Sequence, residues 1–202
     1  MNIAILGSGV VGQALATAYP KHGHQVRIGT RQPEVGEHPV DTPAAAAAWG
    51  DLVVLAVKGE AAVDVLTGVR DEVADKVVID TTNPLEFSTG KPGLSVGWND
   101  SLGEQVQRAV PEAKVVKAYN IVGNTLMVDP ELPGGRPTML IAGNDDAAKA
   151  TVTGLLTDTG WDVSDLGGIE ASRYLEPMCI AWVLHGIRSG SWDHAFKLVS
   201  KD

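Results

Sequence analysis

The chain has 202 residues, of which 44% are hydrophobic, so it is long enough to bury a sizeable core, and we expect a single domain over 1–202. Its formal net charge of −9 and its pI near 4.9 argue against a nucleic-acid or anionic-membrane partner, because both need a basic protein surface.

Membrane insertion, secretion and structural metal binding are not expected either. No run approaches the roughly 20 apolar residues of a membrane span, and the first residues lack the basic region of a signal peptide, so we expect a cytoplasmic protein. The single Cys179 can neither form an internal disulfide nor lead a zinc cluster. We interpret it as a buried packing residue and expect no metal site.

Short apolar runs rich in Val and Ile predict strands that are buried on both faces. They are the segments 2–6, 25–29, 51–57, 76–80, 113–119 and 137–143, and the series continues into 161–167. Helical patterns separate them. Thr42 is suited to cap a helix that begins at Pro43, and Pro20 should shorten or kink the first helix. The stretch 169–188 predicts one long helix.

The alternation of strands and helices implies right-handed crossovers and a doubly wound sheet. We therefore expect an α/β fold of Rossmann type, with a mostly parallel sheet and with 169–202 as a C-terminal helix and tail. That helix would pack on the sheet or on a partner subunit. Two long irregular segments, 81–101 and 123–137, begin at the carboxyl ends of predicted strands, where ligands bind in open α/β sheets. One cleft could use both.

A glycine-rich turn follows the first predicted strand. The stretch ILGSGVVGQ has the G-x-G-x-x-G spacing, in which the first Gly permits a tight turn, the second lets the backbone approach a diphosphate and the third allows close helix packing. The N-terminus of the next helix would direct free N–H groups and a positive dipole at the phosphates. The predicted cofactor-binding turn consists of Gly7, Ser8, Gly9, Val10, Val11 and Gly12.

The second predicted strand ends in Thr30 and Arg31, where this motif usually has an acid that binds the adenosine ribose. An acid would repel a 2′-phosphate, whereas a guanidinium can hold it through paired charge-assisted bonds and a hydroxyl can donate another. These two residues therefore predict NADP(H) as the cofactor. The alternative is that Arg31 is only a solvated loop residue.

Polar residues near the expected cleft include Lys58, Asn83 and Asn120. Lys58 could contact a phosphate or remain solvated, and Asn83 could bond the nicotinamide or cap its Asn-Pro turn. Asn120 is followed by Ile121 and Val122, which are suited to contact a flat ring. No acid/base constellation is evident, so we assign no catalytic residue.

Several motifs together resemble a known family. The stretches ILGSGVVGQALA, GTRQP, IDTTNPL, KVVKAYN, IAGND and RYLEPM, in this order, are similar to those of the bacterial and archaeal NADPH-dependent reductases of the deazaflavin coenzyme F420. The resemblance covers about 2–188. One departure is that Tyr119, Asn120 and Ile121 stand where the family usually has Phe-Asn-Thr, so either coenzyme F420 or a flavin stays open as the acceptor.

The resemblance implies a residue-by-residue assignment. NADP would pass Ala56, Val57 and Lys58, with Asn83 and Pro84 near the nicotinamide. The acceptor ring would lie near the segment Asn120, Ile121, Val122 and Gly123. Members of the family commonly form homodimers, for which the last helix is a candidate contact.

Hydride transfer between two rings needs them face to face at roughly 3–3.5 Å, and the cofactors carry the chemistry. The absence of an evident acid/base constellation agrees with this function. Two alternatives stay open. One is a small-substrate imine or keto reductase, although such enzymes normally add a large helical domain for which little chain is left. The other is a non-catalytic NADP-binding redox sensor.

Overall fold

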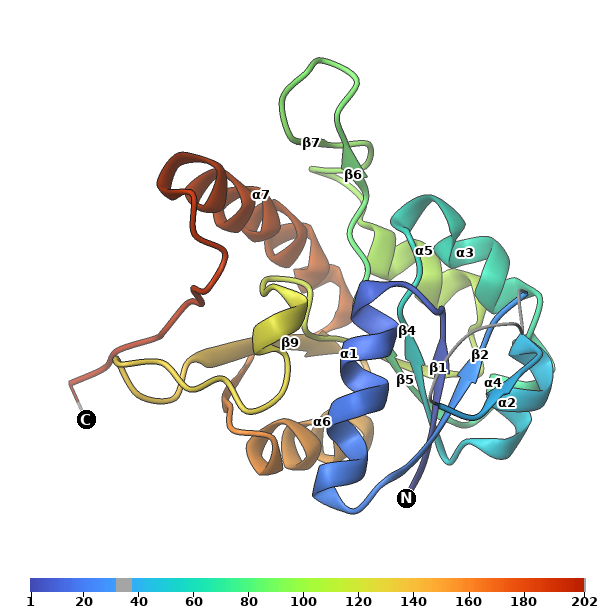
Figure 1. The fold of residues 1–202 in the computed structure, drawn as a ribbon. Helices are drawn as coiled ribbons and strands as arrows, with labels where there is room; N and C mark the ends of the chain where they lie inside the picture. The colour runs from blue at the N-terminus through green and yellow to red at the C-terminus, as the bar shows by residue number, and fades with distance from the viewer. Residues whose placement is uncertain (32–37, 202) are drawn as a thin grey trace.

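One eight-stranded sheet organises the molecule, in the order β10-β9-β8-β5-β4-β1-β2-β3 (Figure 1). The computed structural model describes residues 1–31 and 38–201. The strands of the sheet are β1 (Asn2–Leu6), β2 (Gln25–Gly29), β3 (Val40–Asp41), β4 (Leu52–Leu55), β5 (Val77–Asp80), β8 (Lys114–Lys117), β9 (Thr138–Gly143) and β10 (Asp162–Asp165).

Helices lie between the strands along the chain. The α-helices are α1 (Val10–Ala18), α2 (Pro43–Trp49), α3 (Gly59–Thr67), α4 (Arg70–Val73), α5 (Leu102–Ala109), α6 (Asp146–Asp158) and α7 (Ser172–Ser189). Short 3-10 turns are η1 (Tyr19–His22), η2 (Asn124–Leu126) and η3 (Ile169–Ala171). Among the described residues, none of the helices is both long enough and apolar enough to span a bilayer.

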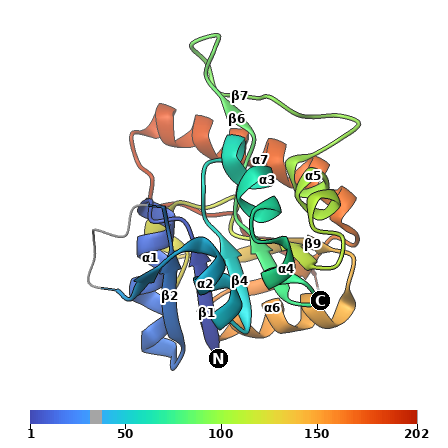
Figure 2. The same cartoon turned by 90° about the vertical axis from the view of Figure 1, so that its right-hand side faces the viewer.

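Both faces of the sheet are covered, as the continuous apolar strands predict. Ile3 and Ile5 of β1 pack in the cluster that includes α1 and α6, whereas Ala4 and Leu6 pack in the cluster of α2 to α5. Figures 1 and 2 show these two helical layers on opposite sides of the strands. The Rossmann-type α/β fold is therefore confirmed.

The strand pairing places a crevice beside β1. This strand pairs in parallel with β2 on one side and with β4 on the other. The direction in which successive strands are added to the sheet therefore reverses between β1 and β4. Open α/β sheets bind ligands outside the carboxyl ends of the strands at such a point. The sheet is mostly parallel, with one antiparallel pairing between β8 and β9.

The strands of the sheet lie within the predicted ranges or coincide with them, except β3, a two-residue strand that the sequence did not predict. The segment 81–101, predicted as irregular, contains the antiparallel hairpin of β6 (Leu85–Glu86) and β7 (Gly93–Leu94). This hairpin extends beyond the body of the molecule in both views (Figures 1 and 2). Because its strands are only two residues long, they are too short to show the alternation of apolar and polar residues by which a strand is predicted from sequence.

Prolines and caps act largely as predicted. Helix α1 ends at Ala18, and Pro20 lies in η1, where its missing N–H is not needed for an α-helical bond. The Thr42 side chain accepts a hydrogen bond from the Ala45 backbone N–H at the start of α2. The predicted helix over 169–188 begins later, at Ser172, after the turn η3. Cys179 of this helix is buried, as predicted.

Candidate nucleotide-binding and redox site

The glycine turn joins β1 to α1 at the point where the winding reverses. Gly7 has φ +123°, which favours glycine, and a Cβ there would collide with the Ala56 carbonyl oxygen at the end of β4. A Cβ at Gly12 would collide with the Gly7 carbonyl oxygen. These glycines therefore let three backbone segments approach one another closely, as the motif predicts.

Gly9 differs from its neighbours because it faces open space. A Cβ at Gly9 would meet no heavy atom within 4 Å, and its backbone is extended. It is the N-cap of α1, whose first turn contains no acidic side chain. The first N–H groups of a helix lack intrahelical partners, and the dipole is positive at this end. The turn is thus an open cradle with hydrogen-bond donors, which fits a diphosphate.

Two adjoining cavities meet at this cradle. The first, of about 580 Å³, is lined by Gly9, Val10, Val11, Ala56, Val57, Lys58, Gly59, Glu60, Thr81, Thr82, Asn83, Leu85 and Phe87. The second, of about 510 Å³, is lined by Gly7, Ser8, Gly9, Gly29, Thr30, Arg31, Pro43, Ala56, Val57, Lys58, Glu60, Ala61 and Val65. Most predicted cofactor residues therefore lie on one continuous surface.

The second cavity contains the residues predicted to bind the 2′-phosphate. The hydroxyls of Ser8 and Thr30 are 3.2 Å apart, and the exposed Arg31 follows at the end of β2. Lys58 adds a second cation to the lining and Glu60 an anion. Hydroxyl and cationic groups therefore line the same cavity as the glycine turn.

The first cavity contains Asn83, which is held by Asn120. Asn83 Nδ2 donates to the Asn120 carbonyl oxygen (2.8 Å), and Asn120 Nδ2 donates to Asn83 Oδ1 (3.0 Å). Each amide group has two donors and two acceptor sites, so Asn83 keeps hydrogen-bonding capacity for a ligand. Pro84, in contrast, is buried and lines neither cavity.

The predicted acceptor segment lies deeper than the sequence suggests. Asn120, Ile121 and Val122 are buried, with exposed fractions of 3%, 2% and 8%. Ile121 and Val122 pack in the core, and a Cβ at Gly123 would lie 3.1 Å from the Trp182 ring. These residues line neither cavity, so a role in binding the acceptor stays a prediction.

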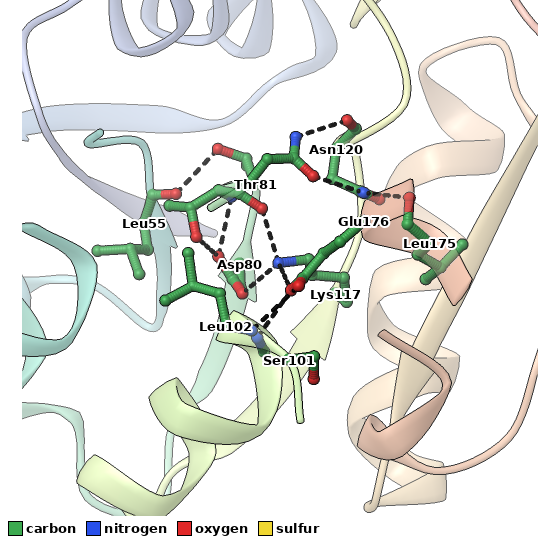
Figure 3. A network of polar contacts seen from close by, with 12 residues as sticks. Leu55, Asp80, Thr81, Ser101, Leu102, Lys117, Asn120, Leu175 and Glu176 are labelled. Atoms are coloured by element: carbon green, nitrogen blue, oxygen red, sulfur yellow. Dashed lines mark hydrogen bonds and ion pairs between the residues drawn. The ribbon is translucent and has the colours of Figure 1, made fainter. Parts of the chain in front are cut away.

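A buried ionic network joins Asp80, Lys117 and Glu176, and the sequence analysis did not identify it (Figure 3). Lys117 Nζ contacts Asp80 Oδ2 and Glu176 Oε1, each at 2.9 Å, and the three side chains are at most 1% exposed. Burial lowers the pKa of Lys117, but the two carboxylates outweigh it and hold that pKa above its usual value. The available signal was a charged residue at the end of each of two apolar strands, β5 and β8.

Among residues 1–31 and 38–201, no group of three or more His, Cys, Asp or Glu side chains could hold a metal ion. The two cavities are lined by apolar side chains together with hydroxyl, amide and cationic groups and the carboxylate of Glu60. Such groups are suited to binding and orienting a nucleotide.

Comparisons with known proteins point to a family of NADP oxidoreductases. Residues 2–84 match a family described as NADP oxidoreductase coenzyme F420-dependent. The F420-dependent NADP reductase of Methanocaldococcus jannaschii is 30% identical over 198 residues, which cover 87% of this chain and 88% of that protein. A crystal structure from Arthrobacter sp. FB24, with a provisional assignment as an F420-dependent NADP reductase, is 40% identical with a TM-score of 0.94 and covers 99% of this chain and 100% of that one.

More distant structures share the fold alone. An imine reductase from Streptomyces aurantiacus is 17% identical with a TM-score of 0.68, and the match covers 94% of this chain and 64% of that one. The nearer relatives are 30% and 40% identical, and the matches cover 88% and 100% of their own lengths. The chain therefore belongs to the family of coenzyme F420-dependent NADP oxidoreductases.

Proposed function

We propose that this protein transfers hydride between NADP(H) and a deazaflavin of the coenzyme F420 type, with a flavin as the alternative acceptor. Membership of the family makes the chain an NADP-dependent oxidoreductase, and the identity of the acceptor is the proposed part. One observation carries the proposal: two cavities, one beside hydroxyl and cationic groups and one beside an amide and apolar groups, meet at the open turn at Gly9.

In this proposal each part of the chain has a binding role. The N–H groups at the start of α1 hold the diphosphate. Thr30 and Arg31 hold the 2′-phosphate, and the backbone after β4, from Ala56 to Lys58, lines the path of the dinucleotide. Asn83 orients the nicotinamide through its remaining hydrogen-bonding capacity, and Pro84 fixes the turn that carries it.

The reaction needs little from the protein besides positioning. When bound, the nicotinamide supplies or accepts the hydride, so the chain has to hold two rings in contact and keep water away from them. Val10, Leu85 and Phe87 place exposed apolar side chains around the first cavity, with exposed fractions of 73%, 38% and 58%. Such side chains are suited to cover a flat ring system. We also assign to Asn120 to Gly123 the role of supporting the acceptor ring.

An acceptor screen tests the proposal. Purified protein is mixed with NADPH and, in separate reactions, with oxidised coenzyme F420, FMN, FAD or a cyclic imine, and the loss of NADPH is followed. We expect rapid oxidation with the deazaflavin or a flavin. Turnover with the imine alone would replace the proposal by the small-substrate reductase. Binding of NADPH without turnover by any acceptor would favour the sensor.

We also propose that the protein is a cytoplasmic homodimer that uses α7 as a contact. Tyr174, Leu184 and Ile187 of this helix are exposed by 71%, 43% and 56%, and exposed apolar side chains favour association. Sedimentation of the purified protein tests this. A dimer is expected, and Ile187→Glu should shift it toward monomer. A wild-type monomer at micromolar concentration would contradict the proposal.

A further inference from the structure

The three charged side chains of the buried network, Asp80, Lys117 and Glu176, use nearly all of their hydrogen-bonding capacity (Figure 3). Lys117 Nζ has three donors, and it contacts Asp80 Oδ2 (2.9 Å), Glu176 Oε1 (2.9 Å) and the Thr82 carbonyl oxygen (2.6 Å). Asp80 Oδ1 accepts from the backbone N–H and the hydroxyl of Thr82, at 2.9 and 2.7 Å. The ammonium group is therefore fixed by three acceptors and cannot turn.

Glu176 connects this network to two helices. It belongs to α7, and its carboxylate accepts from the backbone N–H groups of Leu102 (3.0 Å) and Gly103 (2.9 Å) in the first turn of α5. A carboxylate at a helix N-terminus is favourable because of the helix dipole. The network thus ties the ends of β5 and β8 to α5 and α7.

Stability alone is a weak reason for such an arrangement. Removing charges from water is costly, and replacing a buried ion pair by apolar residues of similar volume is often neutral or stabilising. Here three charges are almost fully buried between two helices and the sheet. We therefore interpret this network as one that fixes the local geometry of the residues bonded to it.

The geometry that it specifies is that of the Asn83 amide. Thr82, whose N–H, hydroxyl and carbonyl groups all bond to the network, directly precedes Asn83. On the other side, Asn120 donates from Nδ2 to Asn83 Oδ1 and to the carbonyl oxygen of Leu175, at 3.0 Å each. Leu175 directly precedes Glu176. Both supports of Asn83 are therefore fixed by the same network.

We propose that Lys117 and Glu176 are positioning residues, which hold the Asn83 side chain in the orientation that binds the nicotinamide. This inference rests on the proposed function, because it assumes that the nicotinamide lies in the first cavity. Neither residue lines the first or the second cavity. They act through Thr82 and through the Asn120 contact with α7.

The chain offers a matched control in the same pair of helices. Arg173 of α7 forms a short bidentate ion pair with Glu104 of α5, from Nε to Oε2 at 2.8 Å and from Nη2 to Oε1 at 2.6 Å. This pair joins α5 to α7 as Glu176 does, but it has no hydrogen bond to Thr82, Asn83 or Asn120 in the described part of the chain. Arg173→Met therefore weakens the helix contact and leaves the supports of Asn83 in place.

The test variant is the double substitution Asp80→Asn with Lys117→Met. It removes one charge of each sign, so the net charge of the cluster does not change. The asparagine can still accept from Thr82, and Glu176 can still cap α5. The bond to the Thr82 carbonyl oxygen is lost. If the double variant does not unfold cooperatively, Glu176→Gln, which keeps Lys117 and the side-chain volume, takes its place in the same measurement.

The measurement compares two ligands by calorimetry: NADPH and 2′-phospho-ADP-ribose, which lacks the nicotinamide. We expect the wild type to bind NADPH about tenfold more tightly than the fragment. The double variant should lose most of this preference while its affinity for the fragment changes by less than about threefold. The Arg173→Met control should keep the preference, even where its melting temperature falls.

The outcomes separate this inference from the proposed function. A wild type that binds neither ligand would overturn the assignment of NADP(H) and this inference with it. A folded variant that retains the full preference for NADPH would overturn the positioning role and leave the proposed function intact. Equal binding of both ligands by the wild type would do the same. If the Arg173→Met control lost as much of the preference as the test variant, the effect would come from the contact between α5 and α7, and the positioning role would be wrong.

Discussion

Asn83 and Asn120 bond to each other reciprocally across 37 positions of the chain, with each side-chain amide donating to the other residue at 2.8 and 3.0 Å. One follows β5 and the other follows β8, which are neighbours in the sheet. Because carboxyl ends of parallel strands meet at one edge, these two amides share that edge. This pairing places Asn83 in the wall of the first cavity instead of leaving it as a cap of its own turn.

Asn83→Ala should therefore impair turnover more than cofactor affinity. The amide would contact only the nicotinamide end, whereas the phosphates supply most of the affinity for the dinucleotide. We expect kcat to fall by about 100-fold and the Kd for NADPH to rise by about tenfold, while the Kd for 2′-phospho-ADP-ribose changes by less than about threefold. Steady-state kinetics measures kcat, and calorimetry measures the two Kd values. Asn99→Ala, which removes an exposed amide that lines neither cavity, is the control. A Kd for NADPH that rises as much as kcat falls would argue against the assigned role.

Arg31→Glu should shift the cofactor preference from NADPH toward NADH. The substitution removes a cation that can pair with the 2′-phosphate and places an anion there, which repels the phosphate and can accept from a ribose hydroxyl. We expect the Kd for NADPH to rise by about 100-fold, or about 2.8 kcal/mol, while the Kd for NADH changes little. Binding titrations with both nucleotides provide the measurement.

The control for this variant is Arg188→Glu, which makes the same change of charge in the last turn of α7, at an exposed position away from both cavities. It should leave both affinities near those of the wild type. If Arg31→Glu weakened NADPH and NADH equally, the preference for a 2′-phosphate would have to come from elsewhere in the site.

The sequence predicts the glycine turn well because its constraints are local. Gly7 needs a positive φ, and Gly12 needs close approach to Gly7, so both requirements are visible in six consecutive residues. The apolar strands are similarly local, since a strand buried on both faces needs a continuous apolar run. These features were sufficient to predict the order of most elements and the position of the cleft.

The ionic network could not be predicted because its members meet only in the folded chain. Asp80 and Lys117 are 37 positions apart, and Glu176 comes from a helix that follows the last strand of the sheet. The burial of Ile121 and Val122 depends in the same way on packing that involves distant segments. Periodicity indicates that these residues are apolar. It does not indicate whether they face a ligand or the core.

Gly9→Ala and Gly12→Ala should separate binding from folding. A Cβ at Gly9 has space in the folded protein but projects where the diphosphate would pass. We expect an unchanged melting temperature and a Kd for NADPH raised by at least about tenfold. A Cβ at Gly12 would collide with the Gly7 carbonyl oxygen, and we expect a loss of about 1–3 kcal/mol in the free energy of unfolding.

Thermal unfolding and calorimetry on the same two preparations distinguish these effects, and each variant serves as the control for the other. If the Gly9→Ala protein bound NADPH like the wild type, the diphosphate would not bind at this turn. A Gly12→Ala protein of normal stability would mean that the contact with Gly7 relaxes at little cost.

The stability of the protein should fall at alkaline pH. Tyr19 and Tyr119 are fully buried, with their hydroxyls 3.3 Å apart, and burial raises the pKa of both above the usual value near 10. The pKa of Lys117 is also raised, because the paired carboxylates outweigh the effect of burial. Above pH about 10 the unfolded chain loses these protons while the folded chain retains them.

The stabilisation from these groups is therefore complete below pH about 10 and is lost as the pH rises through the folded-state pKa values. Urea unfolding between pH about 8 and 11 should show a decreasing free energy of unfolding. The double variant Tyr19→Phe, Tyr119→Phe should reduce the slope, whereas Tyr174→Phe, at an exposed tyrosine, should not. An equal slope in the wild type and the double variant would mean that the buried tyrosine pair does not couple folding to alkaline titration, and would leave Lys117 as the coupled group.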